Sequence, residues 1–246
     1  MSILTSAGRP GGFGSRLTTL GILECGAPPD ALVSRFGTYG AMVKRLLGPD
    51  RDTVTFDVTR GELPASATEH RGYVLTGSPA GVYEDLPWIP GLIGFLQQAR
   101  GSTRLVGLCF GHQAMARAFG ADVIKSPKGW SIGLHGYEVR ERAPWMDDAA
   151  QIRLPASHQD QVVTCPPRAR VTVASAFTPN AGLDYGDAIS FQFHPEFSPE
   201  FGRALIEARR DRYGALADPA LASYGQPDDC ARVGQWIRRF LDAPGL

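Results

Sequence analysis

One short stretch decides the fold: residues 105–113 read LVGLCFGHQ. An apolar run ends in Gly-x-Cys-x-Gly and a helical pattern follows, which is typical of a strand, a sharp turn and a helix. The turn leaves room only for small residues two positions before and after Cys109, which explains Gly107 and Gly111. It also projects the thiol at a helix N-terminus, whose positive end favours the thiolate. The stretch predicts an α/β fold with Cys109 as a nucleophile rather than a buried structural cysteine.

The sequence on either side of this stretch alternates between apolar runs and helical patterns. We expect strands at Leu17–Leu23, Thr53–Val58, Tyr73–Thr76 and Leu105–Leu108, and helices at about Ala31–Leu47 and Trp88–Arg100. Strands separated by helices indicate a largely parallel, buried sheet. In such a sheet the ligand site lies at the carboxyl ends of the strands.

The second half of the chain has shorter strand-like pieces, which either extend that sheet or form a mixed one. They cover Leu134–Val139, Gln161–Thr164, Val171–Ala174 and Ala188–Phe193. A mainly helical tail runs from Pro199 to Leu241, interrupted around residues 225–227. Residues 1–16 are rich in Gly, Ser and Arg, and we expect a flexible lead-in there. Residues 17–246 are then expected to form a single domain.

The charges and cysteines of the 246 residues argue against several classes of protein. Basic and acidic residues number 25 each, so no overall field attracts nucleic acid or an anionic membrane, and we expect a small-molecule partner. No apolar run approaches the roughly 18 residues needed to span a bilayer. The N-terminus lacks the order of a signal peptide, which favours the cytoplasm. The four cysteines form no CxxC pair, so neither a metal site nor a disulfide framework is expected.

A second chemical pattern closes an apolar run, where residues 188–196 read AISFQFHPE. The carboxyl end of such a strand faces the ligand crevice, so His194 can meet Cys109 there although the two are far apart in sequence. A thiol nucleophile needs a base, and the imidazole needs a carboxylate that fixes its tautomer, a role that Glu196 can fill. Pro195 restricts the backbone around His194, which stiffens this turn.

Both patterns resemble the signatures of one family, the class I glutamine amidotransferases: GLCFGHQ at residues 107–113 and HPE at residues 194–196. The resemblance implies a three-layer α/β sandwich with a largely parallel central sheet. It also implies a catalytic triad of Cys109, His194 and Glu196. The expected reaction is cysteine-dependent hydrolysis of the side-chain amide of glutamine or a γ-glutamyl compound, through a γ-glutamyl thioester and without a cofactor.

Two further segments resemble the family. TGSP at residues 76–79 is similar to its oxyanion loop, in which a Gly often stands at the position of Ser78. This likeness implies an oxyanion hole formed by the amides of Phe110 and of Gly77 or Ser78. SHQDQV at residues 157–162 is similar to another family segment, whose polar side chains are expected to hold loops together.

The resemblance also suggests how the α-amino-acid end of a substrate binds. Gln113 contacts that end in one interpretation and makes only a helix-cap contact in the other. The loop GWSIG at residues 129–133 includes Trp130, Ser131 and Ile132. These residues either offer backbone groups to the same end or form a plain strand entry.

The function remains open between three interpretations, because no synthase domain follows the amidotransferase-like region. The chain is either a free-standing γ-glutamyl hydrolase or peptidase, or a glutaminase subunit that feeds ammonia to a separate synthase. GSPAGVYEDLPW at residues 77–88 resembles stand-alone members similar to the amidotransferase part of GMP synthases, which favours the free-standing form. A non-catalytic binding or regulatory module is the third interpretation, and the intact Cys109, His194 and Glu196 argue against it.

Overall fold

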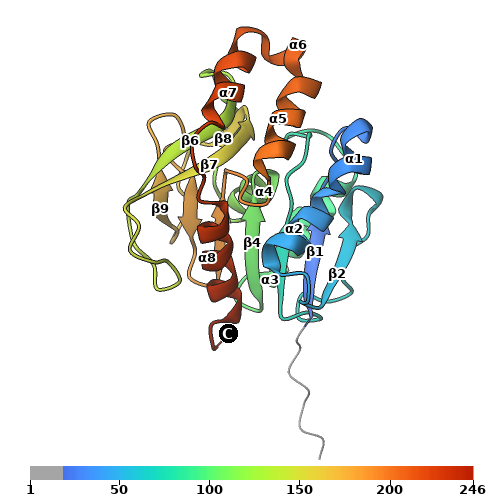
Figure 1. Ribbon diagram of the computed structural model, residues 1–246. Helices are drawn as coiled ribbons and strands as arrows, with labels where there is room; N and C mark the ends of the chain where they lie inside the picture. Colours follow the sequence, from blue (N-terminus) through green and yellow to red (C-terminus); the bar gives the residue numbers. More distant parts are fainter. Residues whose placement is uncertain (1–18, 246) are drawn as a thin grey trace, which may run out of the picture.

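The computed structural model describes residues 19–245, so the lead-in predicted for residues 1–16 lies outside the described residues. A nine-stranded sheet forms the centre, in the order β2-β1-β3-β4-β11-β10-β9-β6-β7. Helices cover both faces of this sheet (Figure 1). The three-layer α/β sandwich that the resemblance implies is therefore confirmed.

The first five strands in that order run parallel. They are β2 (Thr53–Asp57), β1 (Leu20–Glu24), β3 (Gly72–Leu75), β4 (Arg104–Leu108) and β11 (Ala188–Phe191). Every residue of β3, β4 and β11 is buried. Continuous burial is typical of parallel strands covered on both faces, and it explains why these segments read as unbroken apolar runs.

The remaining strands of the large sheet extend it in antiparallel fashion, so the sheet as a whole is mixed. They are β10 (Gly182–Asp184), β9 (Arg170–Ala174), β6 (Ser131–Val139) and β7 (Gln151–His158). Strands β5 (Val123–Lys125) and β8 (Asp160–Val162) pair separately as a two-stranded sheet. Strand β7 is not predicted from the sequence, because Pro155 lies in its middle and proline argues against a strand.

Two helices cover each face of the large sheet. On one face, α3 (Trp88–Ala99) and α4 (Phe110–Ala118) pack against β1, β3 and β4 in one apolar core. On the other face, α2 (Tyr39–Leu47) and α8 (Cys230–Asp242) pack in a second core. Helix α1 (Asp30–Phe36) packs beside α5 (Pro199–Ala208) in a smaller cluster.

The helix expected at about Ala31–Leu47 is in fact two helices, so that prediction is wrong in its continuity. Gly37 has a φ of 84°, in the left-handed region, and ends α1. Thr38 then caps α2, because its Oγ1 accepts a hydrogen bond from the amide of Ala41 at 3.2 Å. The sequence carries a signal for the helix end, Gly37, and one for the next helix start, Thr38. The helical spacing of apolar residues continues across both positions, which is why a single helix was expected.

The tail is mainly helical, as expected. Helices α5, α6 (Arg210–Tyr213) and α7 (Ala217–Ser223) stand together above the sheet (Figure 1), and residues 224–229 separate them from α8. The short 3-10 helices are η1 (Val58–Arg60) and η2 (Gly214–Leu216). Within residues 19–245, no helix combines the length and the apolar character that crossing a membrane requires.

The neighbouring strands β4 and β11 bring the two chemical patterns together. Phe191 lies beside Leu108 in the parallel register. The amide of Cys109 donates a hydrogen bond to the Phe191 carbonyl at 2.8 Å, just beyond the end of β4. The elbow and the His-Pro-Glu tripeptide therefore leave the sheet at the same edge.

Candidate active site

The turn at Cys109 has the strained backbone that the sequence predicts for an elbow. Its φ is 51° and its ψ is −101°, and a positive φ is uncommon for a residue with a side chain. A Cβ at Gly107 would lie 2.6 Å from the backbone of Gly111. A Cβ at Gly111 would lie 2.6 Å from Cβ of Leu75. Side chains at either glycine would thus collide with the packed strand and helix, so the two glycines make this turn possible.

His194 is held by contacts on several sides. Its Nδ1 lies 2.7 Å from Oε1 of Glu196, and the two side chains are only 4% and 0% exposed. Its amide donates to the carbonyl of Pro155 at 2.9 Å, in the strand that the sequence did not predict. The ring of Phe197 stacks on the imidazole, with centroids 3.9 Å apart and planes 7° apart. The imidazole therefore has little freedom to rotate.

The charges around His194 favour its protonated form. Burial by itself lowers the pKa of His194, but the charges of Cys109 and Glu196 outweigh burial and raise that pKa well above its ordinary value. His158 lies in the same region, yet burial lowers its pKa to about 3. His112 is buried beside Ser190 and its pKa is likewise lowered to about 3. Of these three imidazoles, only His194 is set to carry a charge at neutral pH.

The thiols of Cys25 and Cys230 differ from that of Cys109 in their surroundings. Burial raises the pKa of both, which keeps them protonated. The Cys25 thiol donates to the carbonyl of Leu23, and the Cys230 thiol donates to the carbonyl of Phe197. Cys165 is exposed. Only Cys109, among the four, combines an elbow with a neighbouring imidazole.

The residues predicted for an oxyanion hole lie around the Cys109 side chain. A Cβ at Gly77 would lie 3.0 Å from Cε1 of His194 and 3.7 Å from Cβ of Cys109. The amides of Gly77, Ser78 and Phe110 donate no hydrogen bond to any residue in the described part of the chain. The amide of Gly111 ties the elbow to this loop, because it donates to the carbonyl of Thr76 at 3.2 Å.

Two glutamines lie beneath the thiol. Gln192 is fully buried, and its Nε2 lies 3.7 Å from Sγ of Cys109. Gln113 donates from Nε2 to Oε1 of Gln192 at 3.2 Å and to the carbonyl of Asp160 at 3.0 Å. No role for Gln192 is predicted from the sequence. Its nearness to His194 in the sequence was the available signal, because both residues follow directly after β11, at the edge of the sheet where Cys109 lies.

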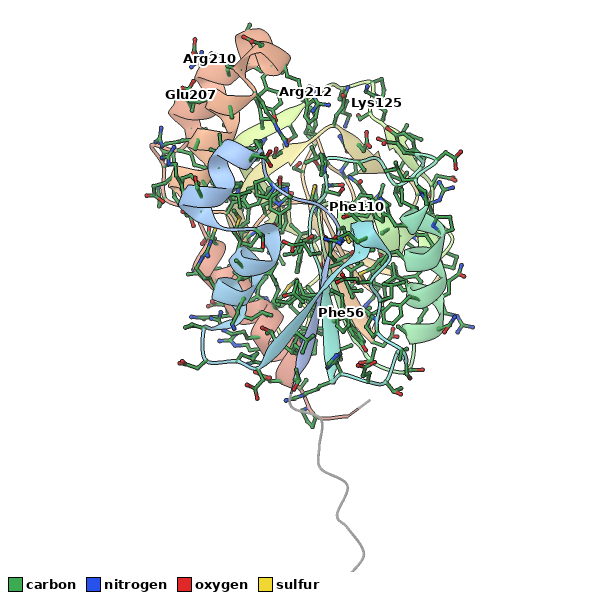
Figure 2. All side chains as sticks on the ribbon, turned by 90° about the vertical axis from the view of Figure 1, so that its right-hand side faces the viewer. Phe56, Phe110, Lys125, Glu207, Arg210 and Arg212 are labelled. Carbon is green, nitrogen blue, oxygen red and sulfur yellow. The ribbon has the colours of Figure 1, made fainter. Side chains whose placement is uncertain are left out.

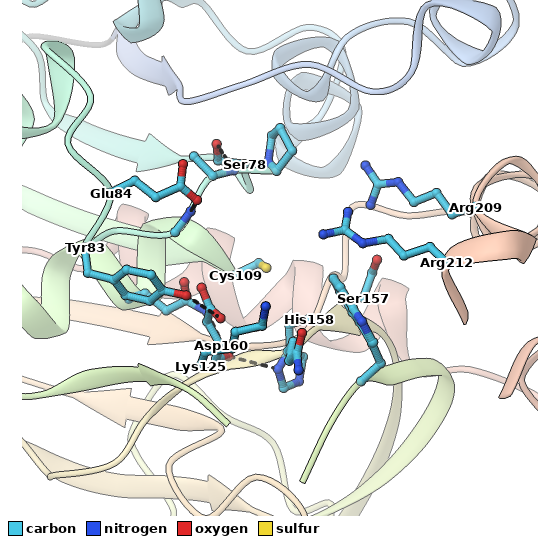
Figure 3. Close-up of a pocket in the computed structure, with 16 residues that line it drawn as sticks. Ser78, Tyr83, Glu84, Cys109, Lys125, Ser157, His158, Asp160, Arg209 and Arg212 are labelled. Carbon is cyan, nitrogen blue, oxygen red and sulfur yellow. Dashed lines mark hydrogen bonds between the residues drawn. The ribbon is translucent and has the colours of Figure 1, made fainter. Parts of the chain in front are cut away.

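Cys109 opens into a cleft, a cavity of about 120 Å³ (Figure 3). The predicted residues Ser78, Gln113 and Trp130 line this cleft. Ser131 and Ile132 do not line it, since they begin β6 and pair with β7. Their role in substrate binding stays a prediction.

Charged side chains line the rest of the cleft, and among them only Asp160 has a role predicted from the sequence, that of holding loops together. Glu84 and Asp160 lie on one side, with Lys125 nearby, and Tyr83 donates to Asp160 at 3.1 Å (Figure 3). Two arginines enter from the opposite side, Arg209 and Arg212. These residues come from four separate segments and meet only in the folded chain, and Lys125, Arg209 and Arg212 lie outside every motif noted in the sequence.

The fold and this geometry define a class of protein: a three-layer α/β protein with cysteine, histidine and glutamate gathered at the carboxyl ends of adjacent parallel strands. Comparison with known proteins gives the family. The family model described as glutamine amidotransferase class-I matches residues 41–209. The chain belongs to this family.

Relatives in this family have differing names. A glutamine amidotransferase-like protein of Schizosaccharomyces pombe is 29% identical over 78% of this chain and 84% of its own length. Gamma-glutamyl peptidase 4 of Arabidopsis thaliana is 27% identical over 74% of this chain and 77% of its own length. A glutamine-hydrolyzing GMP synthase of Thermomicrobium roseum is 32% identical over 53% of this chain, but only 25% of the synthase is matched.

A solved structure agrees with the fold. A glutamine amidotransferase of Thermotoga maritima superimposes with a TM-score of 0.76, over 92% of this chain and 99% of its own, at 20% identity.

Proposed function

We propose that this protein hydrolyses the side-chain amide of glutamine or of a γ-glutamyl compound, with Cys109 as nucleophile. One observation carries the proposal: a strained cysteine elbow opens into a cleft beside an imidazole that is held by a buried carboxylate. A thiol becomes an effective nucleophile when an adjacent base and an orienting third group are present. The names of the relatives support the same class of substrate.

The first step forms a γ-glutamyl thioester. The Cys109 sulfur attacks the γ-carbonyl carbon, the C–N bond breaks, and His194 donates a proton to the leaving nitrogen. The raised pKa of His194 suits this role, because it keeps the imidazole protonated at neutral pH. Glu196 holds the imidazole in position and stabilises its charge.

The second step returns the enzyme to its starting state. His194 takes a proton from a water molecule, the oxygen attacks the thioester carbon, and the C–S bond breaks to release glutamate. In both steps the attack places a negative charge on the carbonyl oxygen of the γ-glutamyl group. This oxyanion would receive hydrogen bonds from the amides of Phe110 and of Gly77 or Ser78. Donors that are already oriented stabilise this charge without reorganisation.

We propose the free-standing form, a γ-glutamyl hydrolase or peptidase, over a glutaminase subunit. The match with a protein named gamma-glutamyl peptidase covers most of both chains, which supports this choice. The alternative rests on the partial match with a GMP synthase, in which a glutamine-hydrolysing part is joined to a larger protein. A chain of the second kind would require a separate synthase as its partner.

One experiment separates these forms. The purified chain is given glutamine, γ-glutamyl amides and γ-glutamyl peptides, while released ammonia and released amines are measured separately. We expect unaided turnover of γ-glutamyl peptides, lost in Cys109→Ala. Glutamine-only turnover that rises on adding cell extract would support the subunit. Absence of turnover on every substrate, with Cys109 unreactive toward an electrophilic glutamine analogue, would leave a binding module.

A further inference from the structure

Three arginines follow one another closely where α5 meets α6, but only one is neutralised. The guanidinium of Arg210 contacts Glu207 at 2.8 and 3.0 Å and Asp218 at 2.7 Å. Figure 2 shows Arg210 and Glu207 together at the top of the molecule, with Arg212 on the side of Lys125. Within residues 19–245, the side chains of Arg209 and Arg212 form no ion pair with a carboxylate and no hydrogen bond.

Both unpaired guanidinium groups face the cleft. Figure 3 shows Arg209 and Arg212 reaching from the same side toward the space above Cys109. Arg212 rests on the ring of Trp130, with 4.6 Å between the guanidinium carbon and the ring centroid, and this contact limits its motion. Arg209 is only partly exposed. Two permanent positive charges beside one cavity repel each other, and an anion bound between them would remove that repulsion.

The opposite side of the cleft already suits the γ-glutamyl group. Its α-ammonium can be met by Asp160 and Glu84, and its α-carboxylate by Lys125, whose charge acts on Asp160. Gln113, which contacts this end in one of its two interpretations, bonds to the backbone of Asp160 and so belongs to the same side. The arginines across the cleft are then available for a second carboxylate, on the far side of the scissile amide.

We propose that Arg209 and Arg212 bind a carboxylate on the leaving group, so that the preferred substrates are γ-glutamyl amino acids or peptides with a free C-terminal carboxylate. A guanidinium suits this task because its planar fork donates two parallel hydrogen bonds to a carboxylate. Glutamine releases ammonia, which has no carboxylate, and so gains nothing from the pair. This inference rests on the proposed function and identifies the substrate class.

The test compares two substrates that differ in one group, γ-glutamylglycine and γ-glutamylglycinamide. Wild-type protein should prefer γ-glutamylglycine, and the double variant R209A/R212A should lose that preference. Charged hydrogen bonds of this kind correspond to about a 10- to 100-fold difference in kcat/KM. R210A is the matched control: it removes a neighbouring guanidinium that is already paired outside the cleft, and it should retain the preference. Circular dichroism and melting temperature check that all variants fold.

Other outcomes would overturn the proposal. An equal loss on both substrates in R209A/R212A would mean that the arginines hold the γ-glutamyl group itself. A preference for γ-glutamylglycine that survives in the double variant would mean that the two arginines do not bind the carboxylate of the leaving group. A binding measurement by calorimetry in the Cys109→Ala background separates this failure from failure of the proposed function. If neither substrate is hydrolysed, γ-glutamylglycine should still bind more tightly than γ-glutamylglycinamide, and R209A/R212A should abolish this difference. Equal binding of the two compounds, or no binding of either, refutes the subsite.

Discussion

The floor and the wall of the cleft are built in opposite ways. On the floor, Cys109, His194 and Glu196 are buried, and the imidazole, the carboxylate and the backbone of the elbow are held by close contacts. The wall consists of the polar and charged side chains that line the rest of the cleft: Tyr83, Glu84, Lys125, Asp160, Arg209 and Arg212. Among them, Arg212 and Lys125 are exposed, and no ion pair fixes their charged ends among the described residues. A buried, bonded group keeps one geometry, whereas an exposed side chain without an ion pair is held less tightly.

This difference separates two tasks. Bond breaking requires groups held within a fraction of an ångström, because small misplacement costs large factors in rate. Choosing a substrate requires charge of the right sign at the right side of the cavity. Changes on the floor should therefore lower kcat by the largest factors, and changes on the wall should mostly alter KM, by smaller factors.

The largest effect is expected from Cys109→Ala. Loss of a catalytic nucleophile lowers turnover on the order of 10⁶-fold in a comparable hydrolase, and an electrophilic glutamine analogue should no longer label the protein. Cys165→Ala is the control, since it removes an exposed thiol that lies outside the cleft. Mass mapping that finds the adduct on Cys25, Cys165 or Cys230, with Cys109 untouched, would refute the assignment.

A smaller loss is expected from Glu196→Gln, about 10²- to 10⁴-fold in kcat, because the carboxylate orients the imidazole but forms no covalent bond. Glu207→Gln changes an exposed carboxylate on α5 in the same way and should have little effect. Steady-state kinetics with matched melting curves measure both. Full turnover in a folded Glu196→Gln protein would assign the orienting role to another group.

Next in size is a change in the titration of His194. Cys109→Ala removes a charge that raises the pKa of His194 while burial, which lowers it, remains, so the pKa should fall. In the wild type, the stabilisation from this raised pKa is complete below the unfolded value of about 6.5 and is lost as pH rises through the folded value. Histidine NMR titration measures the shift. An unchanged pKa in the variant would mean that Cys109 and His194 do not interact.

The smallest effect is expected on the wall. Tyr83→Phe removes a hydrogen bond to Asp160 at 3.1 Å from an exposed side chain, and KM should rise only a few-fold, with a smaller change in kcat. Tyr73→Phe, which loses a hydrogen bond to Ser66 outside the cleft, is the comparison. A loss in kcat as large as that of Glu196→Gln would erase the distinction between floor and wall.

The sequence predicts the floor better than the wall for a physical reason. The elbow and the His-Pro-Glu turn are local: strand, tight turn and helix place Cys109, and one strand end places His194, whatever the rest of the chain does. The family match and the parallel centre of the sheet follow from the same local patterns. The particular roles of Cys109, His194 and Glu196 stay predictions until the variants are measured.

The parts that the sequence analysis missed depend on packing between distant segments. Arg209 and Arg212 belong to an ordinary amphipathic tail, and nothing in their spacing shows that α5 and α6 stand over the cleft. Strand β7 was hidden by Pro155, which the strand tolerates while its carbonyl bonds to His194. The break at Gly37 was hidden by an apolar period that continues across it.

The adjacency of β4 and β11 has a consequence for how such proteins diversify. Between these two adjacent strands the chain adds β6, β7, β9 and β10 to the same sheet, and loops connect these strands to one another. Lengthening a flexible loop whose ends are fixed costs little conformational entropy, only about 0.6 kcal/mol for each doubling of length. Insertions and deletions in the loops between these strands can therefore reshape the specificity of the cleft over evolution while the reacting groups stay in register.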